Sequence, residues 1–117
     1  MRVFFGTLGL TLVFATAAAA GMPDAARGRG LAIEACSACH QVTARQPRPA
    51  PVADPDTAEA VAAPSFAAIG GKFRHDAAGL RAFILAPDHP MREQRFVPRD
   101  LDDIVAYIRA LGHSPRP

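Results

Sequence analysis

The pentapeptide Cys36-Ser37-Ala38-Cys39-His40 contains both cysteines of the chain and one of its four histidines. Two thiols one helical turn apart can each form a thioether with a vinyl group of one porphyrin. The imidazole that follows then lies beneath the ring, with a nitrogen facing the iron. This Cys-x-x-Cys-His spacing is typical of covalent haem c attachment. It predicts Cys36 and Cys39 as the attachment residues and His40 as an axial iron ligand.

Three other interpretations of this pentapeptide are weaker. A thioredoxin-like redox pair requires a βαβ context, and no β-branched run precedes Cys36. A structural zinc site requires four ligands, and the sequence has no second pair of Cys or His residues at a suitable spacing. A disulfide between Cys36 and Cys39 would close too short a loop to add much stability.

Residues 1–20 predict a secretory signal peptide. Arg2 gives a basic start, a short apolar stretch follows, and an alanine run ends at Ala20. An uncleaved membrane anchor is the alternative, because the apolar stretch is just long enough to span a bilayer. Export agrees with the haem motif, since haem is joined to the apoprotein after translocation, where a free Cys-x-x-Cys pair would otherwise oxidise. We therefore expect the domain, residues 21–117, to reside in the bacterial periplasm or its equivalent.

A domain of this length would bury only a modest core unaided. Haem solves this problem by adding a large, flat apolar group around which helices can pack. The formal net charge of the chain is only +2, and no run rich in Lys and Arg occurs. These features argue against nucleic-acid binding.

Three segments are expected to be helical. Asp24 is a suitable N-cap for residues 24–36, and Asp76 for residues 76–86. Residues 98–111 form the clearest amphipathic pattern, with an apolar face made of Leu101, Ile104, Val105, Ile108 and Leu111.

Two glycines interrupt the first of these helices. Gly28 and Gly30 should each weaken it by about 1 kcal/mol relative to Ala. Such a cost predicts that another backbone or a large side chain comes close to both positions.

Residues 41–63 are expected to be a loop. Alternating prolines in the part from 45 to 64 favour an extended, polyproline-like backbone. We interpret this part as an ordered surface arm or a mobile loop, with no chemistry of its own.

The segment after the arm is expected to complete the haem pocket. An axial histidine needs an acceptor for its second ring nitrogen, which fixes the tautomer, and the carbonyl oxygen of Pro64 is our candidate for His40. The expected pocket side chains are large and apolar, namely Phe66, Ile69, Phe73, Leu80 and Phe83.

Met91 is the predicted sixth ligand of the iron. Once the signal peptide is removed, Met22 is the only other methionine, and it lies at the N-terminus. A neutral, soft thioether opposite histidine favours ferrous iron and raises the reduction potential. His89 is the alternative ligand, because it is a stronger base two residues away. His75 and His113 are expected at the surface.

With these features in place, the chain from residue 21 onward resembles a small bacterial class I cytochrome c. The matching points are Gly28, Leu31-Ala32, the Cys-x-x-Cys-His motif, Ala63-Pro64-Ser65-Phe66, Met91, and the last helix from Asp102 to Ile108. The resemblance implies an all-α fold, with three main helices and loops around one covalent haem c. It also implies that the first and last helices cross closely, with Gly28 facing the region of Tyr107, and that one haem edge is exposed.

Three features depart from that family. Many relatives carry an aromatic residue where this chain has residues 31–33, and a Ser or Thr cap where it has Val97-Pro98. The proline-rich loop is also long. None of these departures touches the expected ligands, so they bear on stability and partner choice.

The expected function is one-electron transfer by a soluble periplasmic carrier, not an enzyme, that docks transiently with redox partner proteins as a monomer. The first alternative is the haem subunit of a periplasmic dehydrogenase complex. The second is a sensor or enzyme with an open iron site, which requires Met91 to be absent or labile as a ligand.

Overall fold

The computed structural model describes residues 21–88 and 90–114. The expected signal peptide and the alternative ligand His89 lie outside the described residues. The elements, in chain order, are α1 (Ala25–Cys36), β1 (Val52–Ala53), β2 (Ala60–Val61), α2 (Phe66–Lys72), α3 (Ala77–Leu85) and α4 (Pro98–His113). The regular secondary structure of the described part is thus helical apart from one small hairpin, which confirms the all-α class.

The three expected helices are α1, α3 and α4. Asp24 caps α1 by accepting the N–H of Arg27 at 3.0 Å, and Asp76 caps α3 by accepting the N–H of Gly79 at 2.7 Å. Each cap satisfies a backbone donor that the first helical turn leaves without a partner. The cap of α4, Val97, makes no side-chain hydrogen bond, as expected from the absence of a Ser or Thr there.

Helix α2 is a fourth helix that the sequence patterns did not predict. Ser65 caps it by accepting the N–H of Ala68 at 3.2 Å. The Gly70-Gly71 pair lowers its intrinsic helix propensity, but Gly70 is needed where it stands. A Cβ at Gly70 would collide with the carbonyl of Ile108 and with the backbone of Gly112 in α4. Tertiary packing, which a local pattern cannot report, therefore stabilises this helix.

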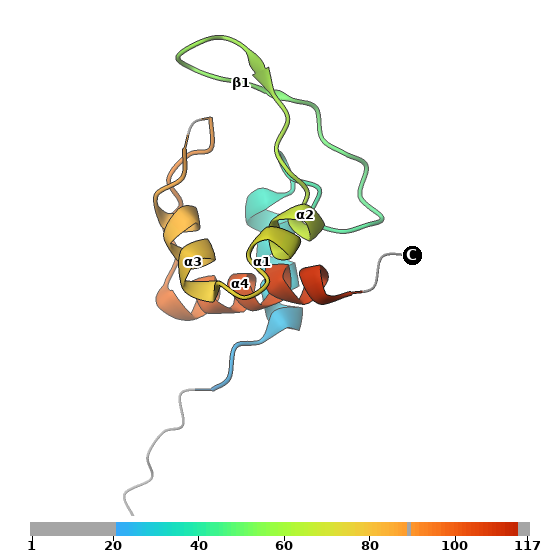
Figure 1. Cartoon of the computed structure of the whole chain (residues 1–117), viewed down its shortest axis with the longest axis vertical. Coiled ribbons are helices and arrows are strands. Elements are labelled where there is room, and N and C mark those ends of the chain that lie inside the picture. Colours follow the sequence, from blue (N-terminus) through green and yellow to red (C-terminus); the bar gives the residue numbers. More distant parts are fainter. Residues whose placement is uncertain (1–20, 89, 115–117) are drawn as a thin grey trace, which may run out of the picture.

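Helix α4 is the centre of the fold, because each of the other three helices packs against it. The hydrophobic core consists of Ala32, Val42, Phe66, Leu80, Ile84, Leu101, Ile104, Val105, Tyr107 and Ile108. Figure 1 shows the helices gathered together, with the β1–β2 arm extending away from them. In the described part of the chain, no helix is both long enough and apolar enough to cross a bilayer.

The crossing of α1 and α4 depends on Gly28. A Cβ at this position would collide with the carbonyl of Asp103 and lie 2.9 Å from the N atom of Ile104. Gly28 therefore contacts α4 about one turn before Tyr107, in the region that the family resemblance implied. The expectation that a backbone or a large side chain comes close to Gly30 is wrong. Nothing lies within 4 Å of a Cβ built there, because this side of α1 faces solvent.

The proline-rich arm is a loop, as expected, that contains a short antiparallel pairing. Val52 pairs with Val61, and Ala53 pairs with Ala60. At the tip, Asp54 accepts the backbone N–H groups of Asp56 and Thr57, at 2.8 and 3.0 Å. These bonds form the turn that lets the chain reverse.

Candidate haem site

A cavity of about 480 Å³ lies between the end of α1, the arm, α2, α3, α4 and the segment around Met91. Its size falls within the range of about 300–1,000 Å³ that is usual for pockets that bind organic ligands. Most of its lining is aliphatic or aromatic. Such a cavity suits a large apolar ring system better than a small polar substrate.

The Cys-x-x-Cys-His turn, residues 36–40, forms one wall of this cavity. Cys36 is the last residue of α1, and its carbonyl oxygen accepts the N–H of His40 at 2.9 Å. Both thiols are free, with Cys36 half-buried and Cys39 exposed. Burial, with a smaller contribution from the Cys39 thiol, raises the pKa of Cys36 to about 11. Cys36 is therefore a neutral thiol at physiological pH.

The His40 side chain is oriented by the segment that precedes α2. Its Nδ1 atom lies 2.7 Å from the carbonyl oxygen of Pro64, as expected. Because a carbonyl only accepts hydrogen bonds, Nδ1 carries the proton and Nε2 keeps a lone pair for a metal. His40 is 9% exposed, and its ring centroid lies 5.4 Å from that of Phe66.

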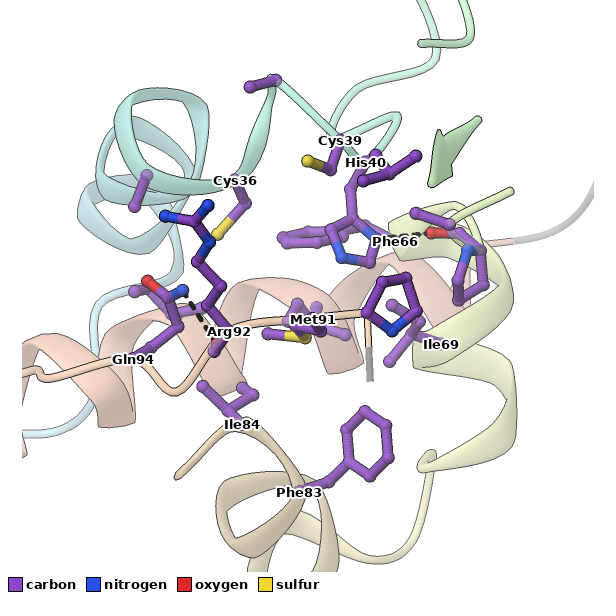
Figure 2. A pocket seen from close by; sticks show the side chains of 18 of the residues that line it. Cys36, Cys39, His40, Phe66, Ile69, Phe83, Ile84, Met91, Arg92 and Gln94 are labelled. Atoms are coloured by element: carbon purple, nitrogen blue, oxygen red, sulfur yellow. Dashed lines mark hydrogen bonds between the residues drawn. The ribbon is translucent and has the colours of Figure 1, made fainter. Parts of the chain in front are cut away.

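Met91 lines the same cavity from a different part of the chain. The close-up view shows the side chains of Cys36, Cys39 and His40 toward one side of the cavity and Phe83 toward the other, with Met91 between them (Figure 2). The turn and Met91 are 51 residues apart in sequence when counted from His40. The fold thus brings a second soft donor to a cavity that already holds an imidazole.

Most of the expected pocket residues lie along this cavity, and one does not. Those that line it are Pro64, Phe66, Ile69, Leu80 and Phe83. Phe73 was expected to line it too, and this expectation is wrong. Phe73 is the C-cap of α2, and its ring packs on that of Phe83, with 6.2 Å between centroids. The end of α2 therefore places Phe73 behind the lining.

The arm, which was expected to be a loop with no chemistry of its own, contributes apolar side chains to the cavity. Val52 of β1 and Val61 of β2 both line it, together with Ala62. They are the two large apolar residues in the stretch 45–64, and this contrast with their Pro, Ala and charged neighbours was the available signal. The two residues are nine positions apart in sequence, so their pairing in the hairpin, which brings both to one wall, could not be read from a local pattern.

Helix α4 and the loop after Met91 provide further lining residues that sequence reasoning did not assign to the cavity. Ile104 and Ile108 reach the cavity from α4, and Arg92 and Gln94 from the loop. The two isoleucines belong to the predicted apolar face of α4. That face could not be divided in advance between helix packing and cavity lining.

The donors present fit haem c. Two thiols one turn apart stand beside an apolar cavity, and the adjacent imidazole has its tautomer fixed with one nitrogen free. In the described ranges, no three His, Cys, Asp or Glu side chains are grouped so that they could hold a metal ion. The two thiols and the imidazole at the cavity suit an iron porphyrin, which brings four nitrogen ligands of its own.

The comparisons with known proteins agree with this geometry. The family model described as Cytochrome c matches residues 25–112, which is more than half of the chain. Searches of curated proteins and of solved structures found no match. The matched segment begins with α1, contains the Cys-x-x-Cys-His turn and ends with α4. The chain therefore belongs to the cytochrome c family, as a small class I domain that carries covalently attached haem c and transfers electrons.

Proposed function

We propose that this chain is a one-electron carrier whose haem is bonded to Cys36 and Cys39 and whose iron lies between His40 and Met91. The observation that carries the proposal is the hydrogen bond from His40 Nδ1 to the Pro64 carbonyl, at the wall of a cavity that Met91 also lines. When bound, haem supplies an iron that changes its oxidation state by one electron. The protein supplies the ligands, the apolar surroundings and a surface for partners.

His40 would act as a permanent ligand, because two constraints already restrict its ring. The Pro64 carbonyl accepts its Nδ1 proton, which makes the Nε2 lone pair more basic. Phe66 packs against the ring and is itself only 3% exposed. A ligand held in this way needs little rearrangement when the iron changes its charge.

Met91 would supply the sixth ligand and close the iron to small molecules. A thioether carries no charge, so ferric iron is stabilised less than it would be by a second imidazole. The apolar lining acts in the same direction, because low polarity disfavours the extra positive charge of the ferric state. Both features support a carrier, in which no substrate binds the iron.

Residues 1–20 would direct export and then be removed, so the mature carrier would act in the periplasm. Covalent haem attachment supports this location. In an oxidising compartment a free Cys-x-x-Cys pair would oxidise, and thioether bonds to haem prevent this. Its donor and acceptor would be proteins that dock transiently. Cys39 supports this idea, since it lines the cavity and is exposed, which places one wall within reach of a partner.

The decisive experiment is the intact mass of the denatured, acid-extracted polypeptide from cells that attach haem c. We expect the mass of residues 21–117 plus one haem, and a reduced spectrum with the sharp α band of low-spin haem c. A polypeptide mass without haem would refute the proposal. The double variant Cys36→Ala/Cys39→Ala is the control, and it should carry no acid-stable haem.

A second measurement separates the carrier from the open-site alternative. Carbon monoxide should react slowly, or not at all, with the reduced protein at neutral pH, because Met91 occupies the sixth position. Rapid and complete binding would instead indicate a sensor or an enzyme. Co-purification with a catalytic subunit in a stable complex would favour the dehydrogenase alternative.

A further inference from the structure

Gln46 makes more hydrogen bonds to the Cys-x-x-Cys-His turn than any other side chain in the described ranges. Its Nε2 donates to the carbonyl oxygens of Ser37 and His40, each at 2.9 Å. Its Oε1 accepts the N–H of Val42 at 3.0 Å. All three bonds from the side chain go to backbone groups. The amide therefore links the turn, at Ser37 and His40, to Val42, which follows the turn in sequence.

The partners determine the orientation of this amide. Carbonyl oxygens only accept, so Nε2 must face Ser37 and His40, whereas the N–H of Val42 only donates and so requires Oε1. A side chain that carries two acceptors or none could not make the same set of bonds. The position therefore requires the amide specifically, and a shorter Asn side chain could not span the same three partners.

The bonds satisfy groups that the local backbone leaves without partners. Helix α1 ends at Cys36, whose carbonyl accepts the N–H groups of Cys39 and His40. The carbonyls of Ser37 and His40 lie beyond that end, where helical partners are missing. Gln46 is half-buried, so water reaches these carbonyls less freely than at an exposed helix end.

The turn of residues 43–46 holds Gln46 in place. Its backbone N–H donates to the carbonyl of Thr43 at 3.2 Å, and its backbone carbonyl accepts the side-chain amide of Gln41 at 2.9 Å. Next to it, Val42 is fully buried, and its carbonyl accepts the hydroxyl of Tyr107 at 2.7 Å. The amide is thus fixed to the core on one side and to the turn on the other.

From these contacts we propose that Gln46 is a positioning residue for the haem site, which holds His40 and the paired cysteines in the one arrangement that suits a single porphyrin. This inference rests on the proposed function. The ring of His40 is anchored by Pro64, and its main chain is anchored by Gln46. When the second anchor is lost, only the Pro64 hydrogen bond and the packing of Phe66 still orient the ring.

The test compares Gln46→Glu and Gln46→Met in the complete holo-protein. Both replacements keep the length of the side chain. Glutamate removes the two N–H donors and places negative oxygens against two carbonyls, and methionine removes all three hydrogen bonds without adding charge. Asp76→Ala is the matched control, because it removes a helix cap from α3 and leaves the turn intact.

Three readouts are measured for each protein: the fraction of chains with haem mass, the reduction potential, and the proton NMR shifts of the haem methyl groups in the ferric state. The last of these report the orientation of the axial ligand planes. In both Gln46 variants we expect the haem methyl pattern to change. We also expect the potential to fall by at least 59 mV, a tenfold change in the equilibrium constant of a one-electron couple, since a looser turn admits water, and glutamate also adds negative charge. Asp76→Ala should lower the unfolding midpoint and leave the haem-bearing fraction, the reduction potential and the haem methyl pattern at wild-type values.

The outcomes separate this inference from the proposed function. If wild-type chains carry no haem, the proposed function itself fails. If all the chains carry haem, and both Gln46 variants keep the wild-type potential and methyl pattern, the positioning role is refuted and the carrier function stands. Loss of haem in both Gln46 variants, with normal loading of Asp76→Ala, supports the positioning role, because the defect then lies in the turn.

Discussion

The carboxylate of Asp103 in α4 accepts the backbone N–H of Asp24, the N-cap residue of α1, at 2.7 Å. The same carboxylate pairs with the guanidinium of Arg27 at 2.6 Å, and Asp103 is only 1% exposed. The first and last helices are thus joined by a buried charge as well as by the close contact at Gly28. Sequence patterns placed Asp103 in the last helix but gave it no partner in α1, because nothing local shows that α1 begins beside it.

We predict that Asp103→Asn changes how stability depends on pH. The hydrogen bond from Asp24 and the pairing with Arg27 lower the pKa of Asp103 in the folded state. Its contribution to stability is therefore complete above the unfolded-state pKa, about 3.9, and is lost as pH falls through the lower folded-state pKa. The difference in unfolding free energy between wild type and variant should be largest at neutral pH and should shrink below about pH 4.

Guanidinium unfolding of the holo-protein across this pH range measures the effect. Asp102→Asn is the control, because it removes an ion pair with Arg81 whose aspartate is 48% exposed, and such surface pairs contribute about 0–1 kcal/mol. A free-energy difference for Asp103→Asn that stays constant from neutral pH to below pH 4 would contradict the lowered pKa.

Gly28→Ala should destabilise the protein, whereas Gly30→Ala should not. At Gly28 the added methyl group meets the backbone of Asp103 and Ile104, which cannot rotate away. Overpacking of this kind costs about 1–3 kcal/mol or more. At Gly30 the added methyl group meets nothing within 4 Å, and Ala is favoured over Gly in a helix by about 0.5–1 kcal/mol.

Thermal unfolding of the two holo-variants side by side provides the measurement. Both substitutions lie in α1, so a general effect of alanine on that helix cancels in the comparison. Equal midpoints for the two variants would show that α1 and α4 are not in close contact at Gly28.

Tyr107→Phe should cost about 1–3 kcal/mol, because it leaves a buried carbonyl without its donor. The hydroxyl of Tyr107 donates to the carbonyl oxygen of Val42 at 2.7 Å, and Val42 is fully buried. Ser114→Ala is a suitable comparison, since its hydroxyl donates to the carbonyl of Ala110 at 3.4 Å in an exposed position. Chemical denaturation should show a loss for Tyr107→Phe and almost none for Ser114→Ala, and equal stabilities would argue against the buried bond.

Met91→Ala should lower the reduction potential, on the order of 100 mV, since axial ligands set haem potentials over a range of about 0.8 V. The ferric spectrum should become high-spin, or change to that of a nitrogen ligand if His89 replaces the sulfur. Redox titration monitored by absorbance measures both changes. Met22→Ala is the control, because Met22 is 91% exposed. The reduction potential of this variant should equal that of the wild type. An unchanged spectrum and potential in Met91→Ala would exclude Met91 as a ligand.

Local sequence signals were sufficient to predict the helices that have an N-cap residue or a periodic apolar face of their own. Asp24 and Asp76 mark the starts of α1 and α3 because an aspartate side chain satisfies a free backbone donor wherever a helix begins. The periodic apolar face of α4 is a property of its own residues. By contrast, α2 could not be predicted, because the Gly70-Gly71 pair lowers its intrinsic helix propensity. The stabilisation that offsets this low propensity comes from packing against α4.

The haem motif and the Pro64 acceptor could be predicted because covalent chemistry and tautomer control each require particular groups. Two thiols and an imidazole at fixed spacing specify the cofactor without reference to the rest of the chain. The identity of the walls required the tertiary structure. Val52, Val61 and Met91 reach the cavity, and Phe73 is displaced from it, through contacts between segments that are far apart in sequence.

The sequence by itself thus determined the cofactor chemistry and the helices that hold it, because bond formation, capping and amphipathic periodicity act over a few residues. The tertiary structure alone decided that Asp103 is buried between α1 and α4, that Gln46 binds the turn, and that the arm forms part of a cavity wall. The physical reason is that burial and long-range hydrogen bonds depend on which segments meet, and this depends on the packing of the whole chain.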